Sequence, residues 1–462
     1  MRLRAGERRI RAARQPYRRR NRRVYKEFES MNVRLKNALV LPNAGAKIQH
    51  GEVCVENGKI VYVGKQNDKM FFPADYEKDC GGNLLVAGFC NAHAHSAMTL
   101  FRGVADDLPL QEWLFDRVFP LEEHLTEEDV YWGSMLAAAE YVRGGTTAVA
   151  DMYFFHATAA EALRKSGLAV ALCCGTNDIG GGNAAESLEY MESRYNTYKG
   201  KDRLKYMLGL HAEYTCSDAL LEGVADLAAR LCAPTYIHCA ETLKEVGECS
   251  VRRSLSPVEY LHKIGFFDEG GIIAHGTYLE KTDIALLRDK NITVASNPSS
   301  NLKLASGVAP IYSLLKNDVR VALGTDGAAS NNALSMFREM YLMSCLQKER
   351  MKDAACVPAE SALFAATKAG YDALGFNGGE IAVGMDADMA LIDINAPCMR
   401  PLSDLKKSLV YSADASAVLM TMAGGHIAYE NGNYHIGEKI EDVYRNAEKC
   451  IKRLLKAAKG GA

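Results

Sequence analysis

“NLLVAGFCNAHAH”, residues 83–95, is an apolar run that ends in two histidines at alternate positions. A short apolar run bounded by turn residues is typical of a buried β-strand. Residues two apart on a strand point to the same face, so we expect His93 and His95 to lie side by side. A single histidine at a strand end is ordinarily a packed or hydrogen-bonded residue. The pair therefore has to be interpreted together with the other runs of the chain.

Seven further runs of this kind follow, and they alternate with stretches such as “SDALLEGVADLAARLC” that carry apolar residues at helical spacing. The runs are “GTTAVADMYF”, “LAVALCCGTND”, “LKYMLGLHAEY”, “PTYIHCAET”, “GIIAHGTYL”, “NITVASNPSS” and “RVALGTDGAAS”. Eight strands alternating with helices over about 290 residues predict an α/β fold, a (β/α)8 TIM-type barrel. A doubly wound open sheet is the alternative, but neither G-x-G-x-x-G nor G-x-x-x-x-G-K-[ST] follows a run.

The segments before and after this region differ from it in their pattern of apolar residues. Residues 31–85 contain short alternating runs around an “ENGKI” turn, and residues 381–440 contain similar runs around “ENGNY”. Asn-Gly between two such runs is a hairpin signal. We therefore expect a small β-sandwich built from both chain ends, a catalytic barrel over residues 86–380 and a C-terminal helix over residues 441–462.

The composition is that of an ordinary globular protein, with 48% hydrophobic and 24% charged residues among 462. No apolar run approaches the roughly 18 residues that a membrane span needs, so no membrane association is expected. The thirteen cysteines are odd in number and form no C-x-x-C pair. Without a secretory signal, this usage predicts reduced thiols and a cytoplasmic protein.

Residues 1–30 carry eleven Arg and one Lys against three Glu. Such a start fits a nucleic-acid-binding arm or a transit peptide. We favour a disordered extension, because “MNVRLKNALVL” from Met31 reads as a natural chain opening that enters a strand directly. No specific nucleic acid partner is expected.

Further metal-binding and proton-carrying side chains end the other runs. His211 ends the fourth run, His238 the fifth, His275 the sixth and Asp326 the eighth. The carboxyl ends of barrel strands converge on one mouth, so these side chains and the first pair would meet there. Three imidazoles and one carboxylate suit Zn²⁺, with Fe²⁺ as the alternative. Taken alone, Asp326 would be an ordinary cap of the next helix.

Such a site is suited to metal-assisted hydrolysis at an sp² carbon. A bound divalent metal lowers the pKa of water to about 7. Asp326 would bind the metal and accept the proton of that water, and Glu241 would deliver a proton to the substrate. His275 would orient the attacking oxygen.

Five longer motifs extend this pattern. They are “NAHAHSAMTLFRGVADDLPLQEWL”, “HAEYTCS”, “IHCAET”, “NPSSNLKLASG” and “GTDGAASNNALSMFREM”. From Met31 to the C-terminal region the chain resembles the amidohydrolase superfamily. Within that superfamily it is similar to the branch that deaminates S-adenosylhomocysteine, methylthioadenosine and related 5′-substituted adenosines.

The resemblance implies one divalent metal per subunit, held by His93, His95, His238 and Asp326, and a homo-oligomer. It further implies that Glu241 shuttles protons, that Glu112 in “QEWL” contacts the ribose hydroxyls and that His211 meets the substrate. A histidine, rather than a lysine, at the end of the fourth run favours one metal over two.

Two positions depart from the branch. Asn183 in “GGN” replaces a frequent Arg, so it can hydrogen-bond to the substrate but cannot neutralise a carboxylate. We therefore predict weaker selection for the homocysteine tail. Glu213 in “HAEYTCS” stands where a neutral residue is more familiar. Glu213 would either repel an anionic tail at the mouth or face solvent at the rim.

The sequence thus predicts an aminohydrolase for a small-molecule nucleoside. Water attacks C6 of the adenine ring, Glu241 protonates N1, and Asp326 relays a proton to the departing amino group. The products would be the inosine derivative and ammonia. The alternatives are a related hydrolase of guanine-type or triazine rings, including dechlorination, and a barrel that serves as a non-catalytic scaffold.

Overall fold

The computed structural model of the protein describes residues 31–179 and 181–460, so the predicted extension over residues 1–30 lies outside the described residues. Within the described part, no helix has both the length and the apolar character needed to cross a membrane.

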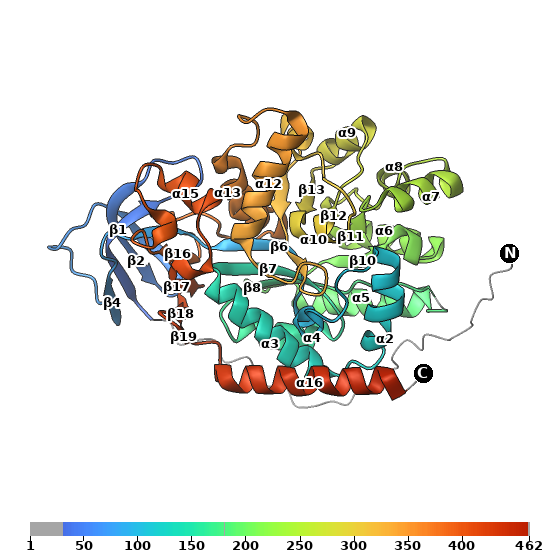
Figure 1. The fold of residues 1–462 in the computed structure, drawn as a ribbon, viewed down its shortest axis with the longest axis horizontal. Coiled ribbons are helices and arrows are strands. Elements are labelled where there is room, and N and C mark those ends of the chain that lie inside the picture. The colour runs from blue at the N-terminus through green and yellow to red at the C-terminus, as the bar shows by residue number, and fades with distance from the viewer. Residues whose placement is uncertain (1–30, 180, 461–462) are drawn as a thin grey trace.

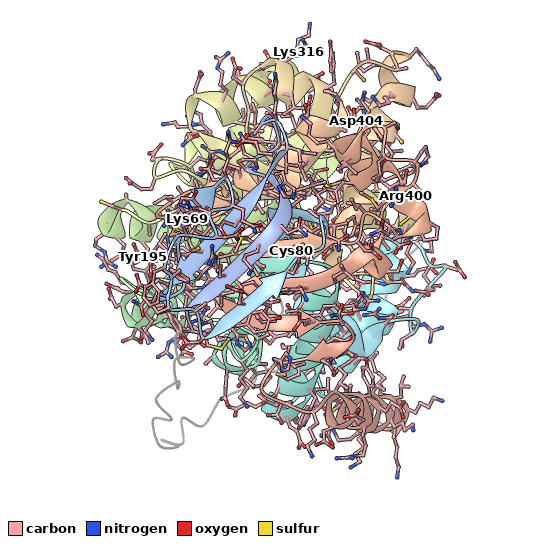
Figure 2. All side chains as sticks on the ribbon, turned by 90° about the vertical axis from the view of Figure 1, so that its left-hand side faces the viewer. Lys69, Cys80, Tyr195, Lys316, Arg400 and Asp404 are labelled. Atoms are coloured by element: carbon pink, nitrogen blue, oxygen red, sulfur yellow. The ribbon has the colours of Figure 1, made fainter. Side chains whose placement is uncertain are left out.

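Strands from both chain ends form one nine-stranded sheet, in the order β19-β18-β17-β16-β5-β1-β2-β3 with β4 paired to β1. These strands are β1 (Val33–Leu41), β2 (Gln49–Glu56), β3 (Lys59–Gly64), β4 (Tyr76–Asp79), β5 (Leu84–Ala87), β16 (Met389–Ile392), β17 (Val418–Ala423), β18 (His426–Glu430) and β19 (Asn433–Tyr434). The two ends meet where β16 pairs antiparallel with β5. Figure 2 shows this sheet in front of the helices of the remaining chain. The arrangement of these strands as two packed layers of a β-sandwich stays a prediction.

The two Asn-Gly signals lie at hairpin turns of this sheet. Asn57 (φ 51°) and Gly58 (φ 74°) join β2 to β3, and Asn431 (φ 46°) and Gly432 (φ 89°) join β18 to β19. Asparagine and glycine adopt positive φ more easily than other residues, which explains why the chain turns at these positions.

The central region contains parallel strands in two five-stranded sheets, β15-β6-β7-β8-β9 and β10-β11-β12-β13-β14. Their bounds are β6 (Phe89–His95), β7 (Thr146–Met152), β8 (Ala169–Cys173), β9 (Leu204–Tyr206), β10 (Leu208–Ala212), β11 (Thr235–Cys239), β12 (Gly271–His275), β13 (Ile292–Ser296), β14 (Val321–Leu323) and β15 (Asp326–Gly327). A bridge between Thr176 and Leu210 joins the two sheets, and β14 contacts β6. The predicted parallel α/β architecture is confirmed, whereas one closed eight-stranded ladder is not present in the strand pairing.

Helices surround these strands (Figure 1). They are α3 (Glu127–Arg143), α4 (His156–Arg164), α5 (Ala184–Tyr198), α6 (Asp218–Leu231), α7 (Leu243–Arg253), α8 (Pro257–Lys263), α9 (Lys281–Asp289), α10 (Pro298–Lys303), α11 (Ile311–Lys316), α12 (Met336–Met351), α13 (Ala359–Ala366), α14 (Lys368–Leu374) and α15 (Leu405–Tyr411). Several of these helices begin at residues that are good N-caps. Thr126 and Asp129 form a capping box on α3, and Ser256 and Glu259 form one on α8.

Between β6 and α3 the chain forms short helical turns, namely η1 (Ser96–Phe101), α1 (Leu110–Glu112), η2 (Trp113–Val118) and α2 (Phe119–Glu122). At the other end of the chain, α16 (Ile440–Gly460) lies along α3 (Figure 1). Its Val443 and Leu454 are fully buried, and Arg453 forms an ion pair with Asp129 of α3.

Candidate active site

The predicted metal ligands meet at the carboxyl ends of β6 and β11 and at Asp326, the first residue of β15. The Nε2 atom of His95 lies 3.0 Å from Oδ1 of Asp326, and Nε2 of His93 lies 3.5 Å from the same oxygen. The Nε2 atoms of His238 and His95 are 3.4 Å apart. One ligand atom from each of His93, His95 and His238 lies within 4.8 Å of the others. The side chains are therefore close enough to bind one ion.

A tyrosine fixes the orientation of the His93 ring. The Tyr236 hydroxyl donates to the carbonyl oxygen of Ala92 at 2.7 Å, so it accepts the 2.7 Å hydrogen bond from Nδ1 of His93. This partner places the ring proton on Nδ1 and leaves the lone pair of Nε2 directed at the cluster.

Backbone carbonyls orient the other two rings in the same way. Nδ1 of His95 donates to the carbonyl of Met152 at 2.5 Å, and Nδ1 of His238 donates to the carbonyl of His211 at 2.6 Å. A carbonyl oxygen can only accept, so Nδ1 of both rings carries a proton and Nε2 faces the cluster.

The residues present fit a divalent cation. Nε2 of the fully buried His93 has no hydrogen-bond partner in the described part of the chain, which is rare for a buried polar atom unless something binds it. Burial lowers the pKa of His93 to about 3, so this ring is neutral. Burial also lowers the pKa of His95, but its hydrogen bond and charge interaction with Asp326 raise it to about 9. Binding of a cation would replace this shared proton, as is usual when metals bind to imidazole and carboxylate groups.

Two serines hold the carboxylate of Asp326. Its Oδ2 accepts hydrogen bonds from Ser300 Oγ at 2.6 Å and Ser330 Oγ at 2.7 Å, which leaves Oδ1 for the histidine side. The backbone of Asp326 has φ 60° and that of His275 has φ 71°. Such conformations cost about 1–3 kcal/mol in residues other than glycine and concentrate at functional sites.

The two proton-carrying candidates lie beside the ligands. Oε1 of Glu241 accepts from Ser306 Oγ at 2.9 Å, and its Oε2 lies 3.9 Å from Nε2 of His275. Nδ1 of His275 donates to Oδ1 of Asn301 at 2.8 Å. Both side chains line the same cavity as Asp326. The geometry thus allows proton exchange with a substrate held over the ligands.

The cavity above the cluster encloses about 790 Å³ of space, part of which is open to solvent. His211 lines it, with its ring centroid 5.0 Å from that of His238, and burial lowers the pKa of His211 to about 4. Among the described residues, the apolar part of the lining is Met98, Leu110, Trp113, Leu114, Phe119, Met152, Phe154 and Leu304. This arrangement combines a base of imidazoles and a carboxylate with an apolar wall.

Two residues of the site, Glu122 in the cavity lining and Tyr236 behind His93, were not predicted from the sequence. Glu122 accepts from the Tyr153 hydroxyl at 2.8 Å, and burial raises the pKa of Glu122 to about 7. Glu122 ends a short helix far from any predicted strand, so no sequence signal pointed to it. Tyr236 could have been found, since it lies two residues before His238 and therefore points to the same face of its strand.

Glu112 and Asn183 are not among the lining residues of this cavity. Glu112 is exposed at the end of α1, whereas the next residue, Trp113, lines the cavity. Asn183 is also exposed, and its Oδ1 accepts from the backbone amides of Ala185 and Glu186 at 3.0 and 3.4 Å. It is the N-cap of α5, and its predicted contact with substrate remains untested.

Both expectations for Glu213 are wrong. Its side chain is buried, and it accepts hydrogen bonds from Arg252 at 2.6 Å and from Arg253 at 2.5 Å. A buried carboxylate needs such charged donors to compensate for lost hydration. Glu213 therefore neither faces solvent nor places a free charge at the mouth.

We compared the chain with protein families, with proteins of known sequence and with solved structures. The sequence model described as “Amidohydrolase family” matches residues 84–428. A 5-methylthioadenosine/S-adenosylhomocysteine deaminase of Dictyoglomus thermophilum is 41% identical over 392 residues, 84% of this chain and 92% of the relative. A 5′-deoxyadenosine deaminase of Methanosarcina mazei is 40% identical over 431 residues, 91% of this chain and 98% of the relative. The crystal structure of an adenosine deaminase from Xanthomonas campestris with bound zinc has a TM-score of 0.88 at 32% identity and covers 93% of this chain and 99% of that one.

Proposed function

The chain belongs to the amidohydrolase family, and we propose that it hydrolyses the adenine ring of 5′-substituted adenosines to the inosine derivative and ammonia. The protein is a hydrolase that acts on C–N bonds. The observation that carries the proposal is that the Nε2 atoms of three histidines and one carboxylate oxygen converge at the base of a cavity that Glu241 and His275 also line.

His93, His95, His238 and Asp326 would hold one divalent ion, for which we propose Zn²⁺ with Fe²⁺ as the alternative. When bound, such an ion lowers the pKa of water and polarises the reacting ring. The zinc found in the adenosine deaminase of related fold supports this choice.

Side chains of the protein carry out the proton transfers and bind the substrate. Asp326 accepts a proton from the water that attacks C6, and its serine partners keep Oδ1 directed at that position. Glu241, held by Ser306, donates a proton to N1 of the ring, and His275 orients the water. Asp326 then gives its proton to the departing amino group, and the proton of the added hydroxyl passes to Glu241 as ammonia leaves and the C6 carbonyl forms. His211 binds the substrate from the cavity wall, and Glu112 contacts the ribose if its segment turns inward.

We also propose that neutral 5′ substituents are preferred over the charged homocysteine tail. Among the described residues, those that line the cavity include no lysine or arginine that could pair with a carboxylate. The two nearby guanidinium groups of Arg252 and Arg253 are engaged by Glu213. A carboxylate that enters such a cavity would lose hydration without gaining a partner.

The decisive experiment is ammonia release by the zinc-loaded protein from adenosine, 5′-deoxyadenosine, methylthioadenosine, S-adenosylhomocysteine and guanine. We expect the highest kcat/KM for 5′-deoxyadenosine or methylthioadenosine. Activity on guanine alone would refute the adenosine assignment, and a zinc-loaded protein without activity would favour a scaffold.

The proposed preference for neutral 5′ substituents over the charged homocysteine tail can be tested separately. Asn183→Arg should raise kcat/KM for S-adenosylhomocysteine relative to 5′-deoxyadenosine, because a guanidinium can pair with the carboxylate. Asn183→Ser is the matched control, since it keeps a helix-capping oxygen without adding charge. Equal ratios in both variants would contradict this part of the proposal.

Three further features belong to the same proposal. The two parallel sheets would act as one barrel that opens at the cavity, and the protein would be a cytoplasmic homo-oligomer. Its thirteen cysteines form no disulfide within the described residues, which supports a reducing compartment.

A further inference from the structure

The turn that presents Glu241 to the cavity has an unusual backbone. Strand β11 ends at Cys239, and the next residue, Ala240, has φ 54° and is almost fully buried. Residues other than glycine rarely adopt this left-handed conformation. Neighbouring groups must therefore hold the Ala240–Glu241 peptide in place.

One side of this peptide is held by the loop after β12. The carbonyl oxygen of Ala240 accepts hydrogen bonds from the backbone amides of Thr277 at 2.8 Å and Tyr278 at 3.0 Å. This loop directly follows His275, so the same contacts connect the two proton-carrying candidates.

The other side is held by a single carboxylate. Oε1 of Glu245 accepts from the amide of Ala240 at 2.7 Å, and its Oε2 accepts from the amide of Glu241 at 2.8 Å. Glu245 is 5% exposed and lies in the first turn of α7, where its own amide donates to the capping hydroxyl of Thr242 at 3.1 Å. Both of its oxygens are therefore used on the residue pair that presents Glu241.

We propose that Glu245 is a positioning residue, which fixes the backbone of Glu241 so that the Glu241 carboxyl reaches the reacting ring. The inference deepens the proposed function, on which it rests for the role of Glu241. Among the described residues, the Glu241 carboxylate accepts a hydrogen bond from Ser306 at 2.9 Å and lies 3.9 Å from Nε2 of His275. Its placement therefore depends mainly on the backbone that Glu245 holds.

Two variants of the full-length, zinc-loaded protein test this. Glu245→Gln keeps one acceptor oxygen but turns an amide NH₂ toward the second backbone donor, and Glu245→Ala removes both acceptors. We expect kcat to fall by about tenfold and about a hundredfold respectively, because small misplacements of a reacting group cost this much. KM and the zinc content should change little, since His238 precedes the turn.

Glu259→Gln is the matched control. Glu259 also accepts a backbone amide at a helix start, that of Ser256 at 2.9 Å, but it does so on α8 and touches no proposed catalytic residue. We expect a similar loss of thermal stability with unchanged kcat. Equal kcat losses in Glu245→Gln and Glu259→Gln would overturn the inference.

A double variant separates positioning from general destabilisation. Glu241→Gln/Glu245→Gln should be no slower than Glu241→Gln alone, because Glu245 acts only through Glu241. Additive losses would show that Glu245 acts elsewhere and would refute the inference.

Amide hydrogen exchange tests the role of Glu245 independently of whether the proposed deaminase activity is correct. Glu245→Gln should speed exchange at the amides of residues 240–241 while α7 stays protected, and unchanged exchange at residues 240–241 would refute the inference. If the wild-type protein released no ammonia from any substrate, the proposed function would fail, while the exchange result would still decide whether Glu245 holds this turn.

Discussion

At the scale of single residues, the hydroxyl of Tyr236 connects the core of the central sheets to the candidate metal centre. It donates to a backbone carbonyl and accepts the Nδ1 proton of His93. Tyr236→Phe leaves that proton without an acceptor and the ring free to turn. We expect zinc affinity to fall by about 10–100-fold, the usual loss when the hydrogen-bond partner of a ligand is removed. Competition with a chromogenic chelator measures this change.

Tyr206→Phe is the control for that variant. The Tyr206 ring is also buried, but its hydroxyl has no hydrogen-bond partner among the described residues. Its removal should leave zinc affinity unchanged. An equal loss in both variants would mean that Tyr236 acts through packing and not through His93.

The partly buried carboxyl of Glu122 provides a prediction about pH. Burial raises its pKa to about 7 from an ordinary 4.5, so the folded protein retains this proton over a range in which the unfolded chain releases it. Stability then decreases as pH rises from about 4.5 to about 7. Glu122→Gln removes this contribution, while its amide oxygen still accepts from Tyr153.

Urea unfolding at about pH 5 and about pH 8 tests this expectation, because the range between them contains the titration of this group. The variant should gain stability relative to wild type at the higher pH. Glu123→Gln, at an exposed neighbouring position, is the control. A pH-independent difference between Glu122→Gln and wild type would contradict the assignment.

The site residues that could be predicted are those whose role follows from strand position. His93, His95, His238, His275 and Asp326 all end apolar runs, and the geometry of parallel strands brings such ends together. The role of Glu122 or Glu213 depends on contacts with segments distant in sequence, which no local pattern encodes. Glu213 in particular is neutralised by arginines that lie about forty residues later in the chain.

At the scale of elements, the apolar runs of the sequence correspond to strands of the structure. Two of these runs, however, do not form continuous strands. The fourth run divides into β9 and β10, and the eighth divides into β14 and β15. Gly324 lies at the second break, where a Cβ atom would come within 2.6 Å of the His93 Cβ and 2.4 Å of Asn297 Oδ1. This close approach brings Asp326 beside the histidines, and periodicity alone does not reveal it.

The C-terminal helix α16 is the element whose contribution is most easily tested. Leu454 is fully buried on the face that packs toward α3, α2 and η1. Leu454→Ala should lower the free energy of unfolding by about 2–5 kcal/mol, the usual cost of such a cavity. Since α16 contributes no residue to the cavity lining, kcat/KM at low temperature should not change.

Lys456→Ala is the matched control on the exposed face of the same helix. Its effect should stay within about 0.5 kcal/mol. Loss of zinc from Leu454→Ala below its unfolding midpoint would show that α16 supports the site through η1, contrary to this expectation.

At the scale of the whole molecule, the two chain ends are joined to the central sheets by a buried ionic cluster. Arg203, just before β9, pairs with Asp386 at 2.9 Å and with Asp388 at 2.8 Å, and both carboxylates precede β16. Lys59 of β3 also pairs with Asp386. The cluster lies at the amino end of β9, away from the cavity. The sequence indicated that both ends form one β unit, but not which charges attach that unit to the rest.

Arg203→Met tests how strongly this cluster holds the molecule together. The substitution keeps most of the apolar stem but leaves Asp388, which is fully buried, without its cationic partner. Breaking a buried pair from one side costs about 3–5 kcal/mol, because the remaining charge stays desolvated. Arg230→Met is the control, since its pair with Glu192 is 59% and 35% exposed and should be worth less than about 1 kcal/mol. Urea unfolding of both variants should show a large shift for Arg203→Met alone, with zinc content unchanged. Equal shifts would mean that apolar packing, and not the ionic cluster, attaches the nine-stranded sheet to the part of the molecule that carries the site.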